Sequence, residues 1–348
     1  MTRPVDTWLL PEGVSDVLPA EAARLEALRR RILDCCAAWG YQLVIPPLME
    51  YLDSLLTGSG HDLDLMTFKI TDQLSGRLMG VRADITPQVA RLDAHALKVE
   101  GPARYCYAGT TLNTRPAALA ASRCPVQVGA ELYGYAGVAG DIEVLRLMLE
   151  TLALAGARGV QLDLGHVALF RGLARLAGID GRDESVLFDI YQRKAVAELK
   201  DFLDGRALDA ATRARFEGLL TLAGDVTVLA RARALLGGLA PGIDAALDAL
   251  AAVAAALQAS HPEVSLYFDL TELRGYHYHT GLVFAAYMPG LRAELAKGGR
   301  YDSVGEAFGR ARPATGFSAD LTALLACADE AIAAELILAP AGEEAALR

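Results

Sequence analysis

The sequence has few cysteines, and their spacing indicates no structural role for them. The five are Cys35, Cys36, Cys106, Cys124 and Cys327, and no Cys-x-x-Cys pair occurs. Cys35 and Cys36 are neighbours on a predicted helix, so their side chains point apart. The pattern suggests neither a zinc knuckle nor a disulfide framework. It favours free thiols that pack as small hydrophobic side chains.

The chain also lacks a long uninterrupted apolar run. Hydrophobic residues make up 53% of it and the mean hydropathy is +0.27, but much of this excess comes from alanine. The most apolar stretch, residues 245–257, is interrupted by Asp248 and is shorter than the roughly 20 apolar residues of a membrane span. The amino-terminal stretch has no apolar segment typical of a signal peptide and already carries Asp6. We therefore expect a cytoplasmic protein that makes no membrane contact.

Positive charge is scarce as well. The 348 residues include 43 acidic and 33 basic side chains, for a formal net charge of -10. Because phosphate contacts dominate the affinity of proteins for nucleic acids, this balance argues against a large nucleic-acid footprint, although a local basic patch stays compatible with it. The length is sufficient for one large domain with an insertion.

Aromatic side chains are rare in one part of the chain. Residues 168–261 are rich in alanine and leucine and follow a helical period, as in DGRALDAATRARFEGLLTLAG and IDAALDALAAVAAALQAS. This segment is predicted to be a helical insertion between two parts of one core, residues 1–167 and 262–327. Residues 328–348 are predicted to form a C-terminal helix and tail.

The rest of the chain alternates between helix and strand patterns. A helix is predicted over residues 19–39, with Pro19 in its first turn and Gly40 at its end. Further helices are predicted over residues 83–97 and 141–155. Strands are predicted over residues 41–45, 67–71, 77–81, 104–112, 126–135, 160–164, 264–268 and 282–287. The pattern indicates an α+β fold in which helices flank an antiparallel sheet.

Residues 274–324 carry the most informative motifs. They include GGRYD and, after a short linker, ATGF, which is predicted to open a helix. This arrangement resembles the third signature motif of histidyl-tRNA synthetase, a class II aminoacyl-tRNA synthetase. LPEGVSDVLP, RADITPQVAR, QVGAELYG and RGYHY are similar to further segments of that family in the same order, so the resemblance covers residues 10–325.

Three departures from the synthetase pattern bear on the chemistry. Asn113 stands where the second motif has an arginine, with Arg115 displaced by two residues, and Ala323 replaces the phosphate-binding arginine of the third motif. We also expect no anticodon-binding domain, which in a synthetase adds about a hundred residues. Losing one positioned donor to a developing negative charge costs about 3–4 kcal/mol. We therefore expect an amino-acid pocket to persist without efficient adenylation.

This combination resembles the regulatory subunit family of short-form ATP phosphoribosyltransferase. The resemblance implies a non-catalytic subunit that activates a catalytic partner at the first step of histidine biosynthesis and takes part in feedback inhibition by L-histidine. It also implies a homodimer through the synthetase-like core and a hetero-octamer of four regulatory and four catalytic chains. No tRNA, cofactor or metal is expected, and no aminoacylation activity of the chain itself.

The same resemblance assigns the residues of a histidine pocket. Asp84, Thr86 and Gln127 match positions that hold the α-amino group, and Asp84 is one carbon shorter than the family's glutamate. Glu131 matches the acceptor of the imidazole N–H, and Arg274 matches the group that holds the carboxylate, which suits a guanidinium. Tyr278 and His279 line the loop, His279 in place of a tyrosine, and Tyr107 is expected to form a wall. The complete set is Asp84, Thr86, Gln127, Glu131, Arg274, Tyr278 and His279.

Taken one at a time, these residues allow other roles. Glu131 fits a solvated carboxylate on a strand, and Arg274 fits a surface ion pair worth about 0–1 kcal/mol. His277 and His279 have the spacing of metal ligands on one strand face, but a metal site needs three or four donors, so packing or hydrogen bonding is favoured. The glycine pair of GGRYD could cradle a phosphate or form a turn.

Two other functions also stay open. The chain could be a free-standing histidine-activating ligase in which Arg115 serves as the phosphate ligand, or a synthetase completed by a separate anticodon-binding chain. Histidine-dependent exchange of pyrophosphate into ATP discriminates the first of these, and aminoacylation of histidine tRNA discriminates the second.

Overall fold

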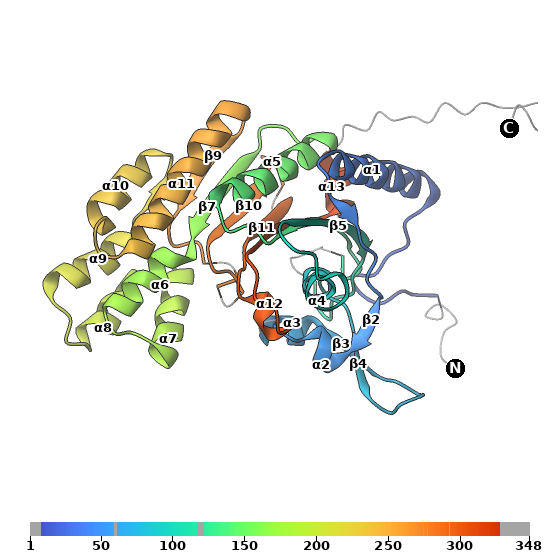
Figure 1. The fold of residues 1–348 in the computed structure, drawn as a ribbon, viewed down its shortest axis with the longest axis horizontal. Helices are drawn as coiled ribbons and strands as arrows, with labels where there is room; N and C mark the ends of the chain where they lie inside the picture. Colours follow the sequence, from blue (N-terminus) through green and yellow to red (C-terminus); the bar gives the residue numbers. More distant parts are fainter. Residues whose placement is uncertain are drawn as a thin grey trace, which may run out of the picture.

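The computed structural model describes residues 8–58, 61–116, 122–273, 275–276, 278–291 and 293–327. A nine-stranded sheet in the order β1-β5-β6-β12-β11-β10-β7-β9-β8 forms the centre of this part of the chain (Figure 1). β1 runs parallel to β5 and β7 runs parallel to β9, and the other neighbours are antiparallel. The predicted α+β class, with a sheet flanked by helices, is confirmed.

The strands agree with most of the sequence-based predictions. The large sheet contains β1 (Gln42–Leu43), β5 (Ala103–Thr110), β6 (Val126–Tyr133), β7 (Gln161–His166), β8 (Ala223–Gly224), β9 (Ser265–Asp269), β10 (Leu282–Tyr287), β11 (Ala296–Arg300) and β12 (Ala314–Asp320). A separate three-stranded sheet in the order β2-β4-β3 contains β2 (Met49–Tyr51), β3 (Phe68–Thr71) and β4 (Leu78–Val81). The polar turn predicted between residues 71 and 77 joins β3 to β4 as a hairpin.

The first helix packs by one face against the core. α1 (Pro19–Ala38) begins at the predicted proline and buries Leu28, Ile32 and Cys36, which recur every four residues and therefore lie on one side. α5 (Val138–Leu154) follows β6 and packs against both α1 and the sheet. Short helices complete the core: α2 (Leu52–Leu55), α3 (His61–Met66), α4 (Thr86–Arg91), α12 (Val304–Ala307) and α13 (Leu321–Leu324).

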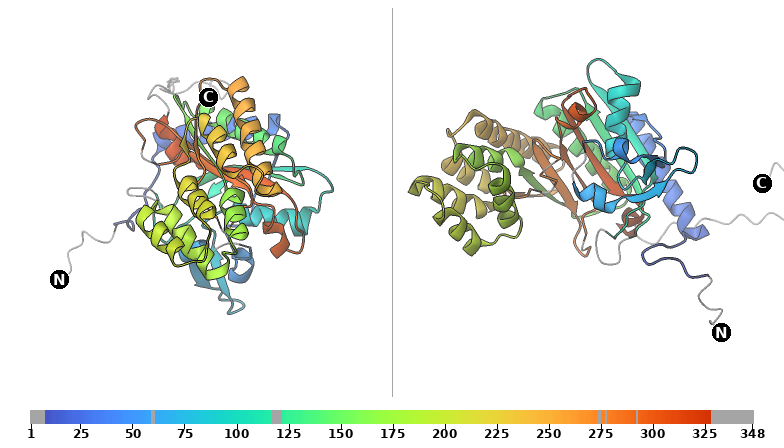
Figure 2. Two further views of the ribbon diagram at one scale, coloured as in Figure 1. Left: turned by 90° about the vertical axis from the view of Figure 1, so that its left-hand side faces the viewer. Right: turned by 90° about the horizontal axis from the view of Figure 1, so that it is seen from below.

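Six helices occupy the predicted insertion. They are α6 (Val167–Leu176), α7 (Gly181–Gln192), α8 (Val196–Asp204), α9 (Ala210–Leu220), α10 (Thr227–Leu236) and α11 (Pro241–Ser260). They gather at one end of the sheet (Figure 2). The intervening strand β8 joins that sheet as an edge, so the division of the chain into a core and an insertion stays a prediction.

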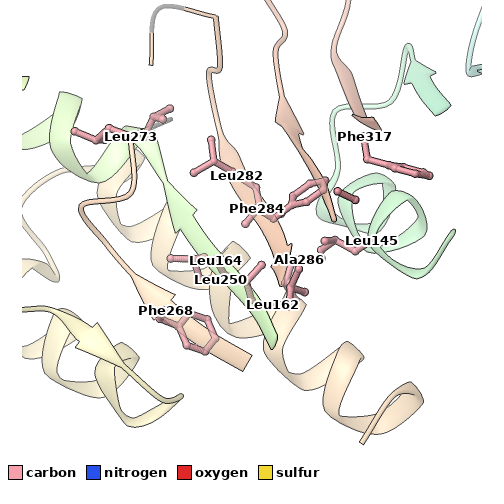
Figure 3. Close-up of a cluster of buried hydrophobic side chains, with 14 of the residues drawn as sticks. Leu145, Leu162, Leu164, Leu250, Phe268, Leu273, Leu282, Phe284, Ala286 and Phe317 are labelled. Carbon is pink, nitrogen blue, oxygen red and sulfur yellow. The ribbon is translucent and has the colours of Figure 1, made fainter. Parts of the chain in front are cut away.

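The helix α11 belongs to the interior of the protein. Among the described residues it is the one helix long and apolar enough to cross a membrane. Its buried side chains, which include Leu250, Val253 and Leu257, instead join the main hydrophobic cluster. Figure 3 shows Leu250 beside Leu162 and Leu164 of β7. The alanine-rich pattern therefore reflects close packing of this helix against its neighbours.

Two sequence-based predictions need correction. ATGF was expected to open a helix, but it lies in β12, and α13 begins only at Leu321. Pairing with β6 on one side and β11 on the other supplies ladder hydrogen bonds that local sequence does not show. The helix expected over residues 83–97 begins at Thr86, and its second half, Leu92–Leu97, is a π-helix. The predicted helix and tail over residues 328–348 lie outside the described residues.

Candidate functional site

Strand register places a group of polar and aromatic side chains on one face of the sheet. Glu131 of β6 pairs with Tyr105 of β5 and with Gly316 of β12, while Tyr107 pairs with Gly129. Residues paired across neighbouring strands point to the same face, and alternate residues point to the opposite one. On the opposite face Cys106, Ala130 and Leu132 join the main hydrophobic cluster, whereas Tyr105, Tyr107 and Tyr133 form a second cluster.

Glu131 lies at the centre of this face. Its side chain is buried, with 1% of the residue exposed. The Tyr107 hydroxyl donates a 3.1 Å hydrogen bond to Oε1, and the Tyr301 hydroxyl donates to Oε2. The hydroxyls of Thr86 and Tyr107 are 3.0 Å apart, and those of Tyr301 and Tyr133 are 3.3 Å apart. The interpretation of Glu131 as a solvated strand carboxylate is therefore wrong.

Burial changes the ionisation of this group. Desolvation raises the pKa of Glu131 to about 8, and the nearby charge of Asp84 acts in the same direction, while the hydrogen bond from Tyr301 opposes it. Burial likewise raises the pKa values of Tyr107, Tyr278 and Tyr301 well above their ordinary value. At neutral pH the carboxyl therefore retains its proton in much of the population, and it can both donate and accept a hydrogen bond.

Asp84, Thr86 and Gln127 form a connected group beside Glu131. Gln127 donates from Nε2 to Asp84 Oδ1 at 2.8 Å, and the backbone N–H of Thr86 donates to the same oxygen at 3.0 Å. The backbone N–H of Ile85 donates to Gln127 Oε1 at 2.8 Å. These bonds hold the Asp84 carboxylate by one oxygen, and no described residue donates to its other oxygen. The group is an acceptor site suited to an ammonium.

The loop between β9 and β10 contributes aromatic rings to the same place. The Tyr278 ring lies 4.9 Å from that of Tyr301, and the His279 ring lies 5.4 Å from that of Tyr278 at 89°. The Tyr278 hydroxyl is buried and has no hydrogen-bond partner among the described residues. Because buried hydroxyls are nearly always paired, this one is a candidate contact for a polar group of a bound ligand. Arg274 and His277 lie outside the described residues.

Glycine forms the floor of the site. A Cβ atom at Gly316 would lie 1.6 Å from Glu131 Oε2, and one at Gly129 would lie 2.4 Å from the Tyr107 hydroxyl. Neither position has room for a methyl group. The absence of side chains at these two positions is what leaves space for the Glu131 carboxyl and the Tyr107 hydroxyl.

The structure describes both positions that are expected to have lost phosphate-binding cations. Asn113 is buried and exchanges backbone contacts with Arg123, which donates from Nε to the Asn113 carbonyl at 3.0 Å and from Nη1 to the Glu12 carbonyl at 3.1 Å. Ala323 is half-buried on α13, and Arg115 is exposed. The site thus has no arginine at either aligned position.

Three buried arginines of the core are engaged in structural contacts. Arg82 donates to the carbonyls of Pro46 and Thr110. Arg300 pairs with Asp141, and Arg312 pairs with Asp93 at 2.8 Å. Buried charges are retained when they are paired in this way. Arg300 of the GGRYD motif therefore stabilises the fold and does not point at a ligand phosphate.

Sequence reasoning missed Tyr301 and Tyr133. Tyr301 belongs to GGRYD, which was interpreted as part of a synthetase motif and as a possible turn or phosphate cradle, but not as a source of a site residue. Tyr133 lies two residues after Glu131 on β6, so the period of two along a strand was a signal for its place on the same face. In the part of the chain that the structure describes, no three His, Cys, Asp or Glu side chains gather as a metal site. All five cysteines are free thiols, and Cys36, Cys106 and Cys327 are buried.

Comparison with known proteins agrees with this geometry. Residues 13–324 match the histidyl-tRNA synthetase family. The ATP phosphoribosyltransferase regulatory subunit of Thioalkalivibrio sulfidiphilus is 56% identical over 98% of this chain and 87% of its own length. The protein of the same name from Ectopseudomonas mendocina is 57% identical over 93% of this chain and 82% of its own length.

A solved structure extends the likeness to the fold. The crystal structure of an ATP phosphoribosyltransferase regulatory subunit/histidyl-tRNA synthetase from Bacillus halodurans superposes with a TM-score of 0.83. It is 27% identical to this chain, and the match covers 93% of this chain and 84% of that one. The chain therefore belongs to the ATP phosphoribosyltransferase regulatory subunits, a family with the histidyl-tRNA synthetase fold.

Proposed function

We propose that the chain is the non-catalytic regulatory subunit of short-form ATP phosphoribosyltransferase and that it binds L-histidine in the site around Glu131. Its partner would be the catalytic subunit that performs the first step of histidine biosynthesis, in a cytoplasmic hetero-octamer of four chains of each kind. The observation that carries the proposal is the buried Glu131 carboxyl, which accepts hydrogen bonds from two tyrosines and lies next to an acceptor group, with no arginine at either aligned phosphate-binding position.

The α-ammonium, the imidazole and the carboxylate of histidine would each have a hydrogen-bonding or charged partner in this site. The Asp84 oxygen to which no described residue donates, together with the Thr86 hydroxyl, suits the α-ammonium. Glu131 suits the imidazole, because a carboxyl near its pKa can donate to one imidazole tautomer or accept from the other. The unpartnered Tyr278 hydroxyl supplies a further contact. Arg274, outside the described residues, is proposed to hold the carboxylate, and His279 to close the loop over the ligand.

Loss of the adenylation reaction follows from the charges. Transfer to the α-phosphate develops negative charge that fixed cations stabilise, and each lost donor costs about 3–4 kcal/mol. Asn113 and Ala323 are uncharged, and Arg123 is held by two backbone carbonyls. We therefore propose that the chain itself neither activates histidine nor aminoacylates tRNA.

Isothermal titration of the purified chain with L-histidine tests the proposal. One molecule per chain is expected to bind, and Glu131→Ala is expected to weaken binding about tenfold, because it removes both the donor and the acceptor for the imidazole and a buried polar group left unsatisfied costs about 1–3 kcal/mol. Asp163→Ala, which removes a strand carboxyl of β7 outside the site, is the matched control and should bind normally.

Two further measurements separate the alternatives. Adding the chain to a short-form catalytic subunit should raise the subunit's turnover, and histidine should lower it. Robust histidine-dependent exchange of pyrophosphate into ATP would instead favour the ligase and would refute the non-catalytic assignment.

A further inference from the structure

The loop that contributes Tyr278 has two faces. Tyr278 points into the cage and packs on Tyr301. Tyr276, two residues earlier, points the opposite way into the helical insertion, where its ring stacks on Phe188 at 4.9 Å and meets the edge of Phe170 at 5.3 Å. One short segment therefore links the proposed ligand pocket with α6 and α7.

Two charged residues of the insertion hold this segment. Arg171 of α6 donates from Nη1 to the His279 carbonyl at 2.9 Å and from Nη2 to the Tyr276 carbonyl, and its guanidinium lies 4.3 Å from the centre of the Tyr276 ring. The Tyr276 hydroxyl donates to Glu184 of α7. The two carbonyls flank Tyr278, so a single guanidinium sets the backbone on both sides of the residue that lines the pocket.

The contacts of Arg171 and Glu184 with the loop are strong enough to transmit a displacement of the loop to α6 and α7. Hydrogen bonds from a cation are about twice as strong as neutral ones, and a half-buried guanidinium stacked on a ring is held by both contacts. A hollow of about 350 Å³ lies beside them, lined by Arg171, Arg175 and Glu184 among others. The contact between α6 and α7 is therefore open to solvent on that side.

We propose that Arg171 is a positioning residue for the histidine pocket and that the insertion helices α6 and α7 sense its occupancy through Tyr276. A ligand that binds the Tyr278 hydroxyl restrains the loop that contains Tyr276 and Tyr278. The hydrogen bonds between this loop and Arg171 and Glu184 then restrain α7 as well. The proposal rests on histidine binding as proposed above. It assigns to the insertion a part in responding to the regulator.

The test combines calorimetry with hydrogen–deuterium exchange on the full chain, with L-histidine as the ligand. In the unchanged protein, histidine should slow exchange in the 275–280 loop and in α7. Arg171→Met should weaken histidine binding about tenfold and abolish the response of α7, because a charge-assisted hydrogen bond of this kind is lost. Arg171→Lys keeps the positive charge but lacks the planar guanidinium that donates to two carbonyls at once, so it should give an intermediate affinity.

Arg175→Met is the matched control, because Arg175 lies one turn further along α6 and makes no hydrogen bond to the described part of the loop. It should bind histidine as the unchanged chain does, and thermal melting should be similar for all three variants. Normal affinity and a normal α7 response in Arg171→Met would overturn the inference. A blank titration with the unchanged chain would refute the proposed function, and this inference with it.

Discussion

At the scale of single residues, the site depends on the absence of a side chain at Gly129 and at Gly316. The Glu131 carboxyl occupies the space that a side chain at Gly316 would need. It cannot move far, because Tyr107 and Tyr301 hold both of its oxygens. Glycine at this point is therefore a requirement of the pocket and not of the backbone, since its φ angle lies outside the left-handed region.

Gly316→Ala should consequently damage binding more than folding. The added methyl group displaces Glu131, and overpacking of this kind costs about 1–3 kcal/mol of stability. Histidine affinity measured by calorimetry should fall at least tenfold. Gly242→Ala, at a helix position where a Cβ meets nothing within 4 Å, is the control and should leave both properties unchanged. Full affinity in Gly316→Ala would contradict the assigned place of the carboxyl.

The sequence anticipated much of the candidate site at this scale. The resemblance brought together Asp84, Thr86, Gln127, Glu131 and Tyr278, and in the structure these side chains surround one place. It did not indicate Tyr301, because the contact between Tyr301 and Glu131 joins residues 170 positions apart. Such a contact depends on how β11 and β12 close the sheet, and no local pattern records it. Histidine binding by this set stays a prediction.

At the scale of elements, β7 and α6 meet at His166. This residue ends the strand and caps the helix, accepting a 3.3 Å hydrogen bond at Nδ1 from the Ala168 N–H. Burial, with the charge of Arg300 as a smaller cause, lowers the pKa of His166 to about 4. The folded protein therefore holds this imidazole neutral, whereas the unfolded chain binds a proton below about pH 6.5.

This difference predicts a loss of stability in acid. Between pH 6.5 and 4 the unfolded state binds more protons, so the free energy of unfolding falls as the pH falls, by about 2 kcal/mol at pH 5 from this residue alone. His166→Asn keeps a capping acceptor and removes the titration. Urea unfolding at pH 7 and pH 5 should show a smaller drop in the variant. Equal drops in the two proteins would show that His166 is not responsible.

Elements with a strong local pattern were the best predicted. α1 begins at its proline and ends before Gly40, because both residues act on the backbone directly. β12 was misassigned, since its residues ATGFSAD are held in a strand by two neighbours and not by their own preference. The π-helix at Leu92–Leu97 has no signature in composition.

At the scale of the whole molecule, the edge of the large sheet at β1 is open. Leu43 is 48% exposed and the nearby Ile45 is 81% exposed, and Leu48 is also exposed. An apolar group of this kind beside an open strand edge is suited to pairing with another chain. We propose that it forms the homodimer seam.

Ile45→Lys should therefore weaken self-association, because it would place a charge in an apolar interface. Sedimentation velocity should show a shift from dimer toward monomer, with circular dichroism unchanged. Val196→Lys, an exposed apolar position on α8 at the far end of the molecule, is the control and should not alter the mass. An undiminished dimer in Ile45→Lys would place the seam elsewhere.

The junction at His166 has a mechanical consequence for the assembly. No connecting residue separates β7 from α6, so the helices α6 to α11 are joined to the sheet at this end without a linker that could act as a hinge. A rotation of these helices, for example one imposed by a neighbouring chain, would therefore reach β7, the third strand from the β8 edge of the sheet, as twist. Its first effect within the sheet would fall on β9 and β10, the two neighbours of β7.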